Sequence, residues 1–534
     1  MARKFKSFVA LAVPIHGVAD RGKGVGRTAD GLVLFVEGAV PGDVADIFVQ
    51  KKKGGFGEGR IENLLQPSPQ RTESFCQHFT VCGGCKWQHL AYSAQLEHKN
   101  QNVLDAFQRI AKVPVGAFLP ILGAPETTHY RNKLEFAFSN KRWLLAEEMI
   151  PPPTHPLGER GAALGYVDQP DSSKTAISLP SGSENSISAN PNIVEGKPPS
   201  PPGEGLGVGF PGLGFHRAGA FDKVVDIHRC WLQAEPSNAV RNAAREIALE
   251  QGLDFYDVRR HTGFLRNLMF RLTTTGELLL LVSFARNEPE AIRTFLDALL
   301  ERFGNQLTTV VYCVNPKLND TVFDLDMVTY HGKGFVVERL GDLQFKIGPK
   351  SFFQTNSAQA KNLYDTVVQF AGLTGTENVY DLYTGTGSIA LYVARFCRQV
   401  VGIEEIPEAI ADAEENRRLN NIENAVFYAG DVKNVLDPAF VERHGPPDLV
   451  ITDPPRAGMH EKAVRFLLDL AAPRIVYVSC NPATQARDVL LLSEKYDVLT
   501  VRPVDMFPHT HHIENVALLV RRDGFPDFQN LESP

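Results

Sequence analysis

Five residues able to bind or react with a polar ligand stand at the ends of five short apolar segments in the C-terminal part of the chain. These residues are Tyr383, Glu404, Asp431, Asp453 and Cys480. Cys480 follows the run IVYVS and would act as a nucleophile if it were partly exposed with a lowered pKa. A buried structural cysteine is the commoner outcome for a single thiol, so the surrounding elements decide between the two interpretations.

The apolar segments have the composition of buried strands, and helix-like stretches separate them. The segments are NVYDLY (378–383), QVVGIE (399–404), AVFYAG (425–430), PDLVIT (447–452) and RIVYVS (474–479). Strands alternating with helices predict an α/β, Rossmann-like domain with a parallel sheet covered on both faces. Ligands of such sheets bind outside the carboxyl ends of the strands, which is where the five residues stand.

A glycine turn follows the first of these strands in DLYTGTGSIA (381–390). Gly385 and Gly387 allow the backbone to approach a ligand closely, and the start of the following helix can receive polar groups. This pattern alone is weak evidence, because it also fits a nicotinamide dinucleotide.

Two features favour methyl transfer over hydride transfer. The third glycine of the dinucleotide fingerprint is replaced by Ala390, and the motif DPPRAG (453–458) has no evident use in a dehydrogenase. Acidic residues at successive strand ends suit a cofactor with a ribose, an adenine and a methyl-sulfonium. Glu404 would accept from the ribose hydroxyls and Asp431 from the adenine amine, which predicts S-adenosylmethionine, although each acid alone could only cap a helix.

Four cysteines outside this domain form a candidate metal site. Cys76, Cys82 and Cys85 are close in sequence, and only one pair has the short spacing that is usual in zinc sites. The fourth ligand must therefore come from far along the chain, and Cys230 in DIHRCWL is the sensible candidate. Spacing alone leaves an iron–sulfur cluster and zinc equally open.

The N-terminal residues 1–66 are predicted to form a small β-barrel, because short strands alternate there with glycine-rich turns. This region holds ten Lys/Arg and seven Asp/Glu, a net charge of +3, including Lys51, Lys52 and Lys53. Such a run is either a solvated face or an RNA-facing patch.

The middle of the chain reads as a separate domain. A helical run is expected from Tyr92 to about Lys112, and LEFAFS (134–139) and VVDIH (224–228) have strand character. Between these strands, residues of about 145–212 are rich in Pro, Gly and Ser and predict a flexible insertion. The domains expected are thus 1–66, 67–350 with this insertion, and 351–534.

Bulk composition is that of a globular protein, with 534 residues, 43% hydrophobic and 22% charged residues, and a net charge of −7. No stretch approaches the roughly 20 apolar residues of a membrane span, so no membrane partner is expected. Seven cysteines are too sparse for a disulfide scaffold, which favours a reducing cytoplasm.

Taken in order, the motifs resemble those of one family. They are CQHFTVCGGC (76–85), Cys230, SFFQTN (351–356), DLYTGTG (381–387), TDPPRAG (452–458), VSCNPAT (478–484) and DMFPHTHHIENV (505–516). The combination resembles the RNA uracil-C5 methyltransferases, specifically the branch with a TRAM domain and an iron–sulfur cluster.

The resemblance implies a role for each matching residue. Cys480 would be the nucleophile and Glu514 the general base. The S-adenosylmethionine contacts would be Gln354, Tyr383, Glu404 and Asp453. Asp431 stands where ribosomal members often carry Asn, and its contact would be with the adenine. The four thiolates Cys76, Cys82, Cys85 and Cys230 would hold a [4Fe–4S] cluster in a central α+β domain.

The chemistry needs these groups because carbon 5 of uracil is a poor nucleophile. Addition of a thiolate to carbon 6 creates an enolate that makes carbon 5 reactive, and a base must later remove the proton on carbon 5. An RNA cytosine-C5 methyltransferase would carry a second cysteine in the fourth-strand motif, and DPPRAG has none. The histidines of HTHH (509–512) fit a polar loop better than zinc.

The resemblance also predicts the partner. Structured RNA is expected as substrate, with 23S ribosomal RNA favoured and transfer RNA as the alternative, and no protein partner is evident. A hypothesis of another class is a non-catalytic RNA-binding protein with a vestigial methyltransferase fold.

Overall fold

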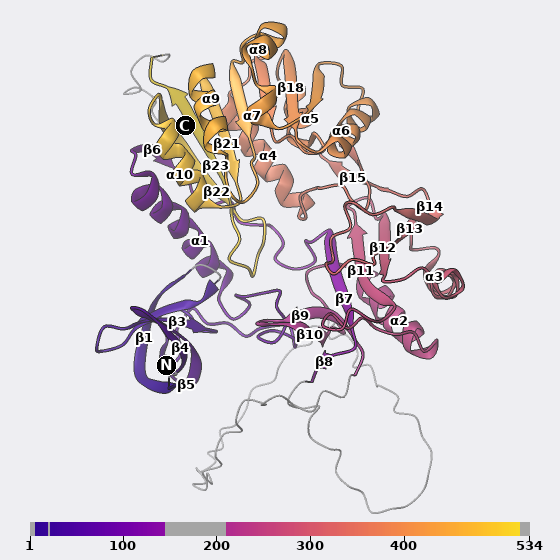
Figure 1. Cartoon of the computed structure of the whole chain (residues 1–534). Coiled ribbons are helices and arrows are strands. Elements are labelled where there is room, and N and C mark those ends of the chain that lie inside the picture. The colour runs from indigo at the N-terminus through magenta and orange to yellow at the C-terminus, as the bar shows by residue number, and fades with distance from the viewer. Residues whose placement is uncertain (1–5, 20–21, 145–209, 524–534) are drawn as a thin grey trace, which may run out of the picture. The chain divides into compact units, whose positions relative to one another are not determined.

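A computed structural model of the protein describes residues 6–19, 22–144 and 210–523. The predicted insertion of about 145–212 lies outside the described residues except at positions 210–212. Figure 1 shows the course of the chain through a barrel, a central sheet, a two-stranded hairpin and a C-terminal sheet. The predicted boundaries 1–66, 67–350 and 351–534 stay a prediction.

The N-terminal strands form a closed barrel in the order β1-β2-β3-β5-β4, which confirms the predicted barrel. Its strands are β1 (Phe8–Val18), β2 (Gly24–Arg27), β3 (Val33–Glu37), β4 (Val44–Lys53) and β5 (Phe56–Gln66). Alternate residues such as Leu34, Val36 and Ile47 point inward and are fully buried. Gly26 is required, because a Cβ there would lie 2.7 Å from Cγ1 of Val13.

A helix follows in the predicted place. α1 (Tyr92–Ala106) continues into the short π-helix η2 (Phe107–Ala111), and Lys112 ends it in a left-handed conformation at φ 54°. The next strand, β6 (Val115–Phe118), pairs in parallel with β22 at the edge of the C-terminal sheet. The N-terminal half of the chain thus supplies an edge strand to the C-terminal sheet.

The central sheet has eight strands in the order β14-β13-β12-β11-β7-β9-β10-β8. Its strands are β7 (Lys133–Ser139), β8 (Arg142–Trp143), β9 (Gly212–Arg217), β10 (Ala220–Asp226), β11 (Leu265–Leu272), β12 (Leu278–Phe284), β13 (Thr309–Val314) and β14 (Val328–Gly332). Helices α2 (Ser237–Glu250) and α3 (Pro289–Phe303) bury their apolar sides against this sheet. This α+β arrangement was predicted. Strand β7 includes the expected segment 134–139, and β10 includes residues 224–226 of the expected segment 224–228.

A hairpin and a helix lead into the C-terminal sheet. They are β15 (Val336–Leu340), β16 (Leu343–Ile347) and α4 (Ser357–Ala371). Asn356 caps α4 by accepting from the N–H of Gln359, and Gly372 ends it at φ 55°.

The C-terminal sheet has the order β19-β18-β17-β20-β21-β23-β22-β6. Its remaining strands are β17 (Asn378–Leu382), β18 (Gln399–Glu404), β19 (Ala425–Ala429), β20 (Leu449–Thr452), β21 (Arg474–Ser479), β22 (Tyr496–Val504) and β23 (Glu514–Arg521). The first five strands in this order are parallel, as predicted, and β23 runs antiparallel to both of its neighbours.

Helices cover both faces of this sheet (Figure 1). They are α5 (Ser388–Ala394), α6 (Pro407–Leu419), α7 (Val432–Val435), α8 (Pro438–His444), α9 (Glu461–Leu470) and α10 (Pro482–Leu492). Residues of α4, α5 and α6 pack into one core, while residues of η2, α9 and α10 pack into the other. Burial from both sides explains why the central strands are apolar at nearly every position.

Candidate functional site

The parallel register brings the predicted residues to one edge of the C-terminal sheet. Leu382 pairs with Ile403 on one side and with Thr452 on the other, so the residues that follow these strands lie next to one another. Tyr383 therefore lies beside Glu404 and Asp453 at the carboxyl end of the sheet. This is the edge at which ligands of such sheets bind.

Cys480 and Glu514 are brought together by the antiparallel pairing of β21 with β23. Ser479 pairs with Asn515, and continuing this register places Cys480 opposite Glu514. Glu514 is only 4% exposed, and Cys480 is half-buried. Residues 34 positions apart in sequence thus meet at the end of two paired strands.

Burial controls the protonation of both groups. It raises the pKa of Cys480 to about 12, with further contributions from the charges of Glu514 and Asp453, and Arg456 acts in the opposite sense. Burial also raises the pKa of Glu514 well above its usual value, helped by Asp453 and opposed by Arg456. In this state Cys480 is a neutral thiol at neutral pH, so activation requires a change of environment.

Two further carboxyls lie at this edge, those of half-buried Asp453 and buried Asp381. Burial raises the pKa of Asp453 to about 7, with a contribution from the charge of Asp381. Burial likewise raises the pKa of Asp381 to about 7, although the hydroxyl of Thr384 donates to its carboxylate at 2.5 Å. Sequence reasoning missed Asp381, whose signal was an acidic residue within an otherwise apolar strand. The charge of Glu404 disfavours ionisation of Asp381, and the charge of Asp381 disfavours ionisation of Asp453.

The glycine turn is held by Glu404. Its carboxylate accepts from the N–H of Gly385 at 3.0 Å and from the N–H of Ile406 at 3.1 Å. Gly385 and Gly387 have φ of 56° and 77°, in the left-handed region that favours glycine. A Cβ on Gly387 would lie 3.0 Å from atoms of Ala413 and Phe427, whereas a Cβ on Gly385 would meet open space.

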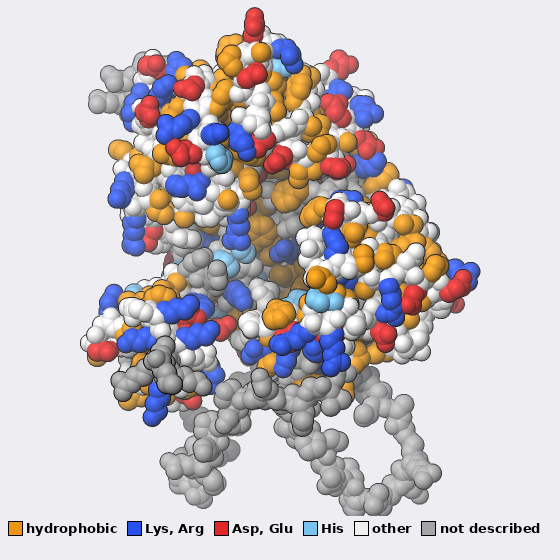
Figure 2. Space-filling view, in the orientation of Figure 1, with side chains coloured by type: hydrophobic (Ala, Val, Ile, Leu, Met, Phe, Trp, Pro, Cys, Tyr) orange, Lys and Arg blue, Asp and Glu red, His pale blue; other side chains and the backbone are white. Residues whose placement is uncertain are grey.

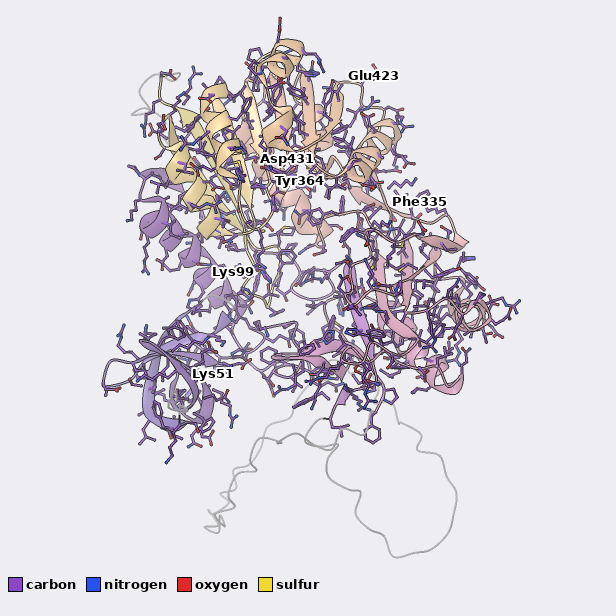
Figure 3. All side chains as sticks on the ribbon, viewed as in Figure 1. Lys51, Lys99, Phe335, Tyr364, Glu423 and Asp431 are labelled. Atoms are coloured by element: carbon purple, nitrogen blue, oxygen red, sulfur yellow. The ribbon has the colours of Figure 1, made fainter. Side chains whose placement is uncertain are left out.

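The other predicted cofactor contacts lie around the same strands. Tyr383 follows β17 with φ 62°. The carboxylate of Asp431 caps α7, accepting from the N–H of Lys433 at 3.1 Å and pairing with its Nζ at 2.6 Å. These contacts lower the pKa of Asp431, which is labelled in Figure 3. Gln354 is buried, and its backbone carbonyl accepts from the side chain of Asn132 at 2.9 Å.

The DPPRAG loop points a cation toward the histidine-rich loop. Nη2 of Arg456 lies 3.0 Å from Nδ1 of His512. The backbone carbonyl of Arg456 accepts from the side chain of Asn481 at 3.1 Å, which joins this loop to the residue after Cys480. Buried Asp488 holds the far end of the loop by accepting from the N–H of Met459 at 2.8 Å.

The loop 505–513, which leads into Glu514, is held by α1. Lys99 of α1, labelled in Figure 3, donates to Oδ1 of Asp505 at 2.6 Å and to the carbonyl of Phe507 at 3.0 Å. The side chains of Lys99 and Asp505 are 1% and 0% exposed. The hydroxyl of Tyr92 donates to the other oxygen of Asp505 at 2.9 Å. We had no sequence signal for this buried ion pair.

His509 joins the same loop to the segment that carries three of the candidate metal ligands. Its N–H donates to Oε1 of Gln95 on α1 at 2.8 Å. Its carbonyl accepts from the N–H groups of Lys86 and Trp87 at 2.8 and 3.1 Å, directly after Cys85. This is a structural role, since buried His509 bonds to protein groups on several sides.

The four candidate thiols line one cavity of about 380 Å³. They are Cys76, Cys82, Cys85 and Cys230. Burial raises the pKa of all four, and that of Cys82 and Cys85 to about 12. Within residues 6–19, 22–144 and 210–523, no three His, Cys, Asp or Glu side chains are grouped closely enough to hold a metal ion. The structure thus gathers the thiols around one cavity, and the central iron–sulfur domain stays a prediction.

Lys51, Lys52 and Lys53 are exposed at the end of β4. Figure 3 labels Lys51 on the barrel. Their role in RNA binding stays a prediction. Of the helices that the structure describes, none is both long and apolar enough to cross a membrane. The cytoplasmic location also stays a prediction.

Models of three protein families match parts of the chain. The model described as tRNA (uracil-5-)-methyltransferase matches residues 446–522. The TRAM domain model matches residues 10–61, and the TRM5/TYW2 methyltransferase domain model matches residues 356–457. The first match contains Asp453, Cys480 and Glu514.

Whole-length relatives carry compatible names. A protein of Porphyromonas gingivalis described as an uncharacterized RNA methyltransferase is 48% identical, covering 95% of this chain and 99% of its own. A Chlorobaculum tepidum protein of the same description is 38% identical over 96% of each. The crystal structure of Pyrococcus abyssi tRNA (uracil-54, C5)-methyltransferase with S-adenosyl-L-homocysteine has a TM-score of 0.65 at 26% identity, covering 96% of this chain and 100% of that one.

Proposed function

Because the chain belongs to the S-adenosylmethionine-dependent RNA (uracil-5-)-methyltransferases, we propose that Cys480 is its nucleophile and Glu514 its general base. The observation that carries this assignment is the β21–β23 register, which sets the two side chains opposite each other at the ligand-binding edge. Both groups must reach the same pyrimidine ring, one at carbon 6 and the other at carbon 5.

The proposed reaction passes through a covalent bond between Cys480 and the base. Cys480 loses its proton to solvent, and its sulfur forms a bond to carbon 6 while the carbon 5–carbon 6 double bond becomes an enolate. Carbon 5 would then attack the methyl group of the sulfonium donor, the bond between the methyl carbon and the sulfonium sulfur would break, and the donor would leave as a neutral thioether. Glu514 takes the proton from carbon 5, the double bond forms again, and the sulfur leaves as a thiolate. Arg456 would stabilise the enolate oxygen through its positive charge.

The raised pKa of Glu514 suits this task. A buried carboxylate is a stronger base than an exposed one, and the positive charge of Arg456 still favours its ionised form. Proton removal of this kind contributes roughly 10²–10⁴-fold to the rate. The remaining edge residues would hold the methyl donor, with Glu404 at the ribose, Asp453, Gln354 and Tyr383 around it, and Asp431 near the adenine.

The assignment is tested with RNA that contains 5-fluorouridine, whose fluorine cannot leave as a cation. The wild type and Glu514→Gln should form a covalent protein–RNA adduct, and Glu514→Gln should accumulate one with ordinary uridine as well. Cys480→Ala should form none, while the control Cys397→Ala, which removes a buried core thiol, should behave as wild type. An adduct in Cys480→Ala would remove Cys480 from its role.

The substrate proposed is a uridine in 23S ribosomal RNA. This choice rests on the combination of a TRAM barrel with the four-thiol cavity, which resembles the ribosomal branch. Transfer RNA is the second candidate, favoured by the similarity to the archaeal tRNA enzyme. Labelled methyl donor, offered with both RNAs in competition and followed by mass spectrometry of nucleosides, distinguishes them.

The thiols Cys76, Cys82, Cys85 and Cys230 are proposed to hold a [4Fe–4S] cluster. One tetrahedral zinc, with Zn–S bonds of about 2.3 Å, would draw four sulfurs to within roughly 4 Å of one another. The thiols instead line one cavity of about 380 Å³, which has room for a larger group. Anaerobically purified protein should contain iron and sulfide, and Cys230→Ser should lose them while Cys313→Ser, in the core, should not. Zinc without iron would overturn the assignment.

A further inference from the structure

A basic surface covers one edge of the central sheet. Figure 2 shows Lys and Arg side chains gathered over β8, β9 and β10. The cations of this edge, together with two aromatic side chains, define what we term the β8–β10 surface. Its members are Lys141, Arg142, Trp143, Arg217, Phe221, Lys223 and Arg259.

Two of these cations lie near the ring of Trp143, which is half-buried. The guanidinium of Arg217 is 3.9 Å from the centre of its ring, and Nζ of Lys223 is 5.1 Å from it. Both distances are within the range of cation–π attraction. The pairing of β8 with β10, in which Val225 faces Trp143, fixes the indole at this edge.

Phe221 on β10 is a second aromatic side chain with a cation near its ring. Its side chain is 67% exposed, which is unusual for a large apolar ring. The guanidinium of Arg259 is 5.5 Å from the centre of this ring. The β8–β10 surface therefore contains two aromatic rings, each with an arginine over it, among several other cations.

The acidic residues of this edge are covered by the cations. Asp222 pairs with Arg259, Asp257 pairs with Lys141 at 2.9 Å, and Asp226 lies below Arg142 at 3.9 Å. Their side chains are 10%, 2% and 5% exposed. The carboxylates thus fix the cations from beneath, while the outer face stays positive.

We propose that the β8–β10 surface binds unpaired nucleotides of the substrate RNA, separately from the barrel. Phosphates would contact the cations, and exposed bases would stack on Trp143 and Phe221, because every base offers a π face to an aromatic ring. This rests only on RNA being the substrate, and it concerns binding apart from the roles of Cys480 and Glu514.

The test measures RNA affinity without methyl donor, across a potassium chloride titration. Two probes are used: a hairpin transcript with a large single-stranded loop, and a fully paired duplex of equal length. Arg217→Gln/Lys223→Gln should reduce the slope of log affinity against log salt for the loop RNA by about 1.5. Trp143→Ala should weaken loop binding about 5- to 150-fold and leave duplex binding unchanged.

A matched control replaces two exposed arginines of α3 in the same domain, as Arg293→Gln/Arg302→Gln. This variant should keep the wild-type slope. In turnover assays the surface variants should raise KM for RNA and leave kcat unchanged. An unchanged salt slope in Arg217→Gln/Lys223→Gln overturns the proposal, even if Trp143→Ala were to misfold. An equal loss of loop and duplex binding in Trp143→Ala would overturn base stacking.

Discussion

The buried ion pair between Lys99 and Asp505 predicts a large loss of stability in Lys99→Met. Methionine replaces the apolar stem of lysine but removes the charge, which leaves the Asp505 carboxylate without its cation in a place where it is 0% exposed. Removing one partner of a buried pair costs about 3–5 kcal/mol. With about 2–4 °C per kcal/mol for units of 150–250 residues, the melting temperature should fall by roughly 6–20 °C.

A double variant separates the ion pair from other effects of the substitution. Lys99→Met/Asp505→Asn removes both charges. The amide oxygen in the place of Oδ1 would still accept from the N–H of Phe507, and the amide nitrogen in the place of Oδ2 would donate to the hydroxyl oxygen of Tyr92. Because neutral replacement of a whole buried pair is often nearly neutral for stability, this variant should recover most of the loss.

Calorimetry or near-ultraviolet circular dichroism of the full chain measures these transitions. The control is Lys361→Met, whose partner Asp365 lies one turn away on α4 and whose side chain is 48% exposed. It should cost only about 0.3–0.5 kcal/mol. If Lys99→Met were no less stable than this control, or if the two charge removals were additive, α1 would not brace the loop through this pair.

Three further outcomes are expected. Because burial raises the pKa of Cys480 to about 12, iodoacetamide should alkylate it roughly 10²–10³-fold more slowly at about pH 8 than an exposed thiol. An alkylation rate that levels off below about pH 9 would contradict the raised pKa. Burial raises the pKa of Asp453 to about 7, so ionisation of this carboxyl destabilises the fold increasingly from about pH 4 to about pH 7. Asp453→Asn should therefore raise the melting temperature more at about pH 8 than at about pH 5. Equal gains at the two pH values would contradict the raised pKa. Gly387→Ala should lower the melting temperature by more than Gly385→Ala, because only the former meets atoms at 3.0 Å, whereas Gly385→Ala should mainly weaken binding of the methyl donor, measured by calorimetric titration.

Much of the C-terminal sheet could be predicted because local signals specified it. Each parallel strand is an apolar run of the expected length, and its last residue marks the ligand edge. The adjacency of Cys480 and Glu514 could not be derived from spacing, because it depends on β23 entering the sheet antiparallel to β21. The motif resemblance supplied that pair in advance of the fold.

Contacts between segments that are distant in sequence could not be predicted from local sequence patterns. Lys99 reads as one more polar residue of an amphipathic helix, and only the tertiary structure makes it a buried cation. The strand β6 is too short to stand out, and its place beside β22 is decided by tertiary pairing. Asp381 lies within the glycine-turn motif, and the sequence gives no sign of its burial. Its raised pKa follows from that burial.

The ion pair between Lys99 of α1 and Asp505 also has a consequence for protein synthesis. Lys99 and Asp505 are separated by 406 positions, so the lysine leaves the ribosome long before its partner exists. At about 5–20 residues per second, the delay is roughly 20–80 s. During this time α1 cannot complete its native contacts, and the loop that leads to Glu514 has not been made. A ribosome-bound chain is therefore expected to display a folded barrel well before the carboxyl edge of the C-terminal sheet is assembled.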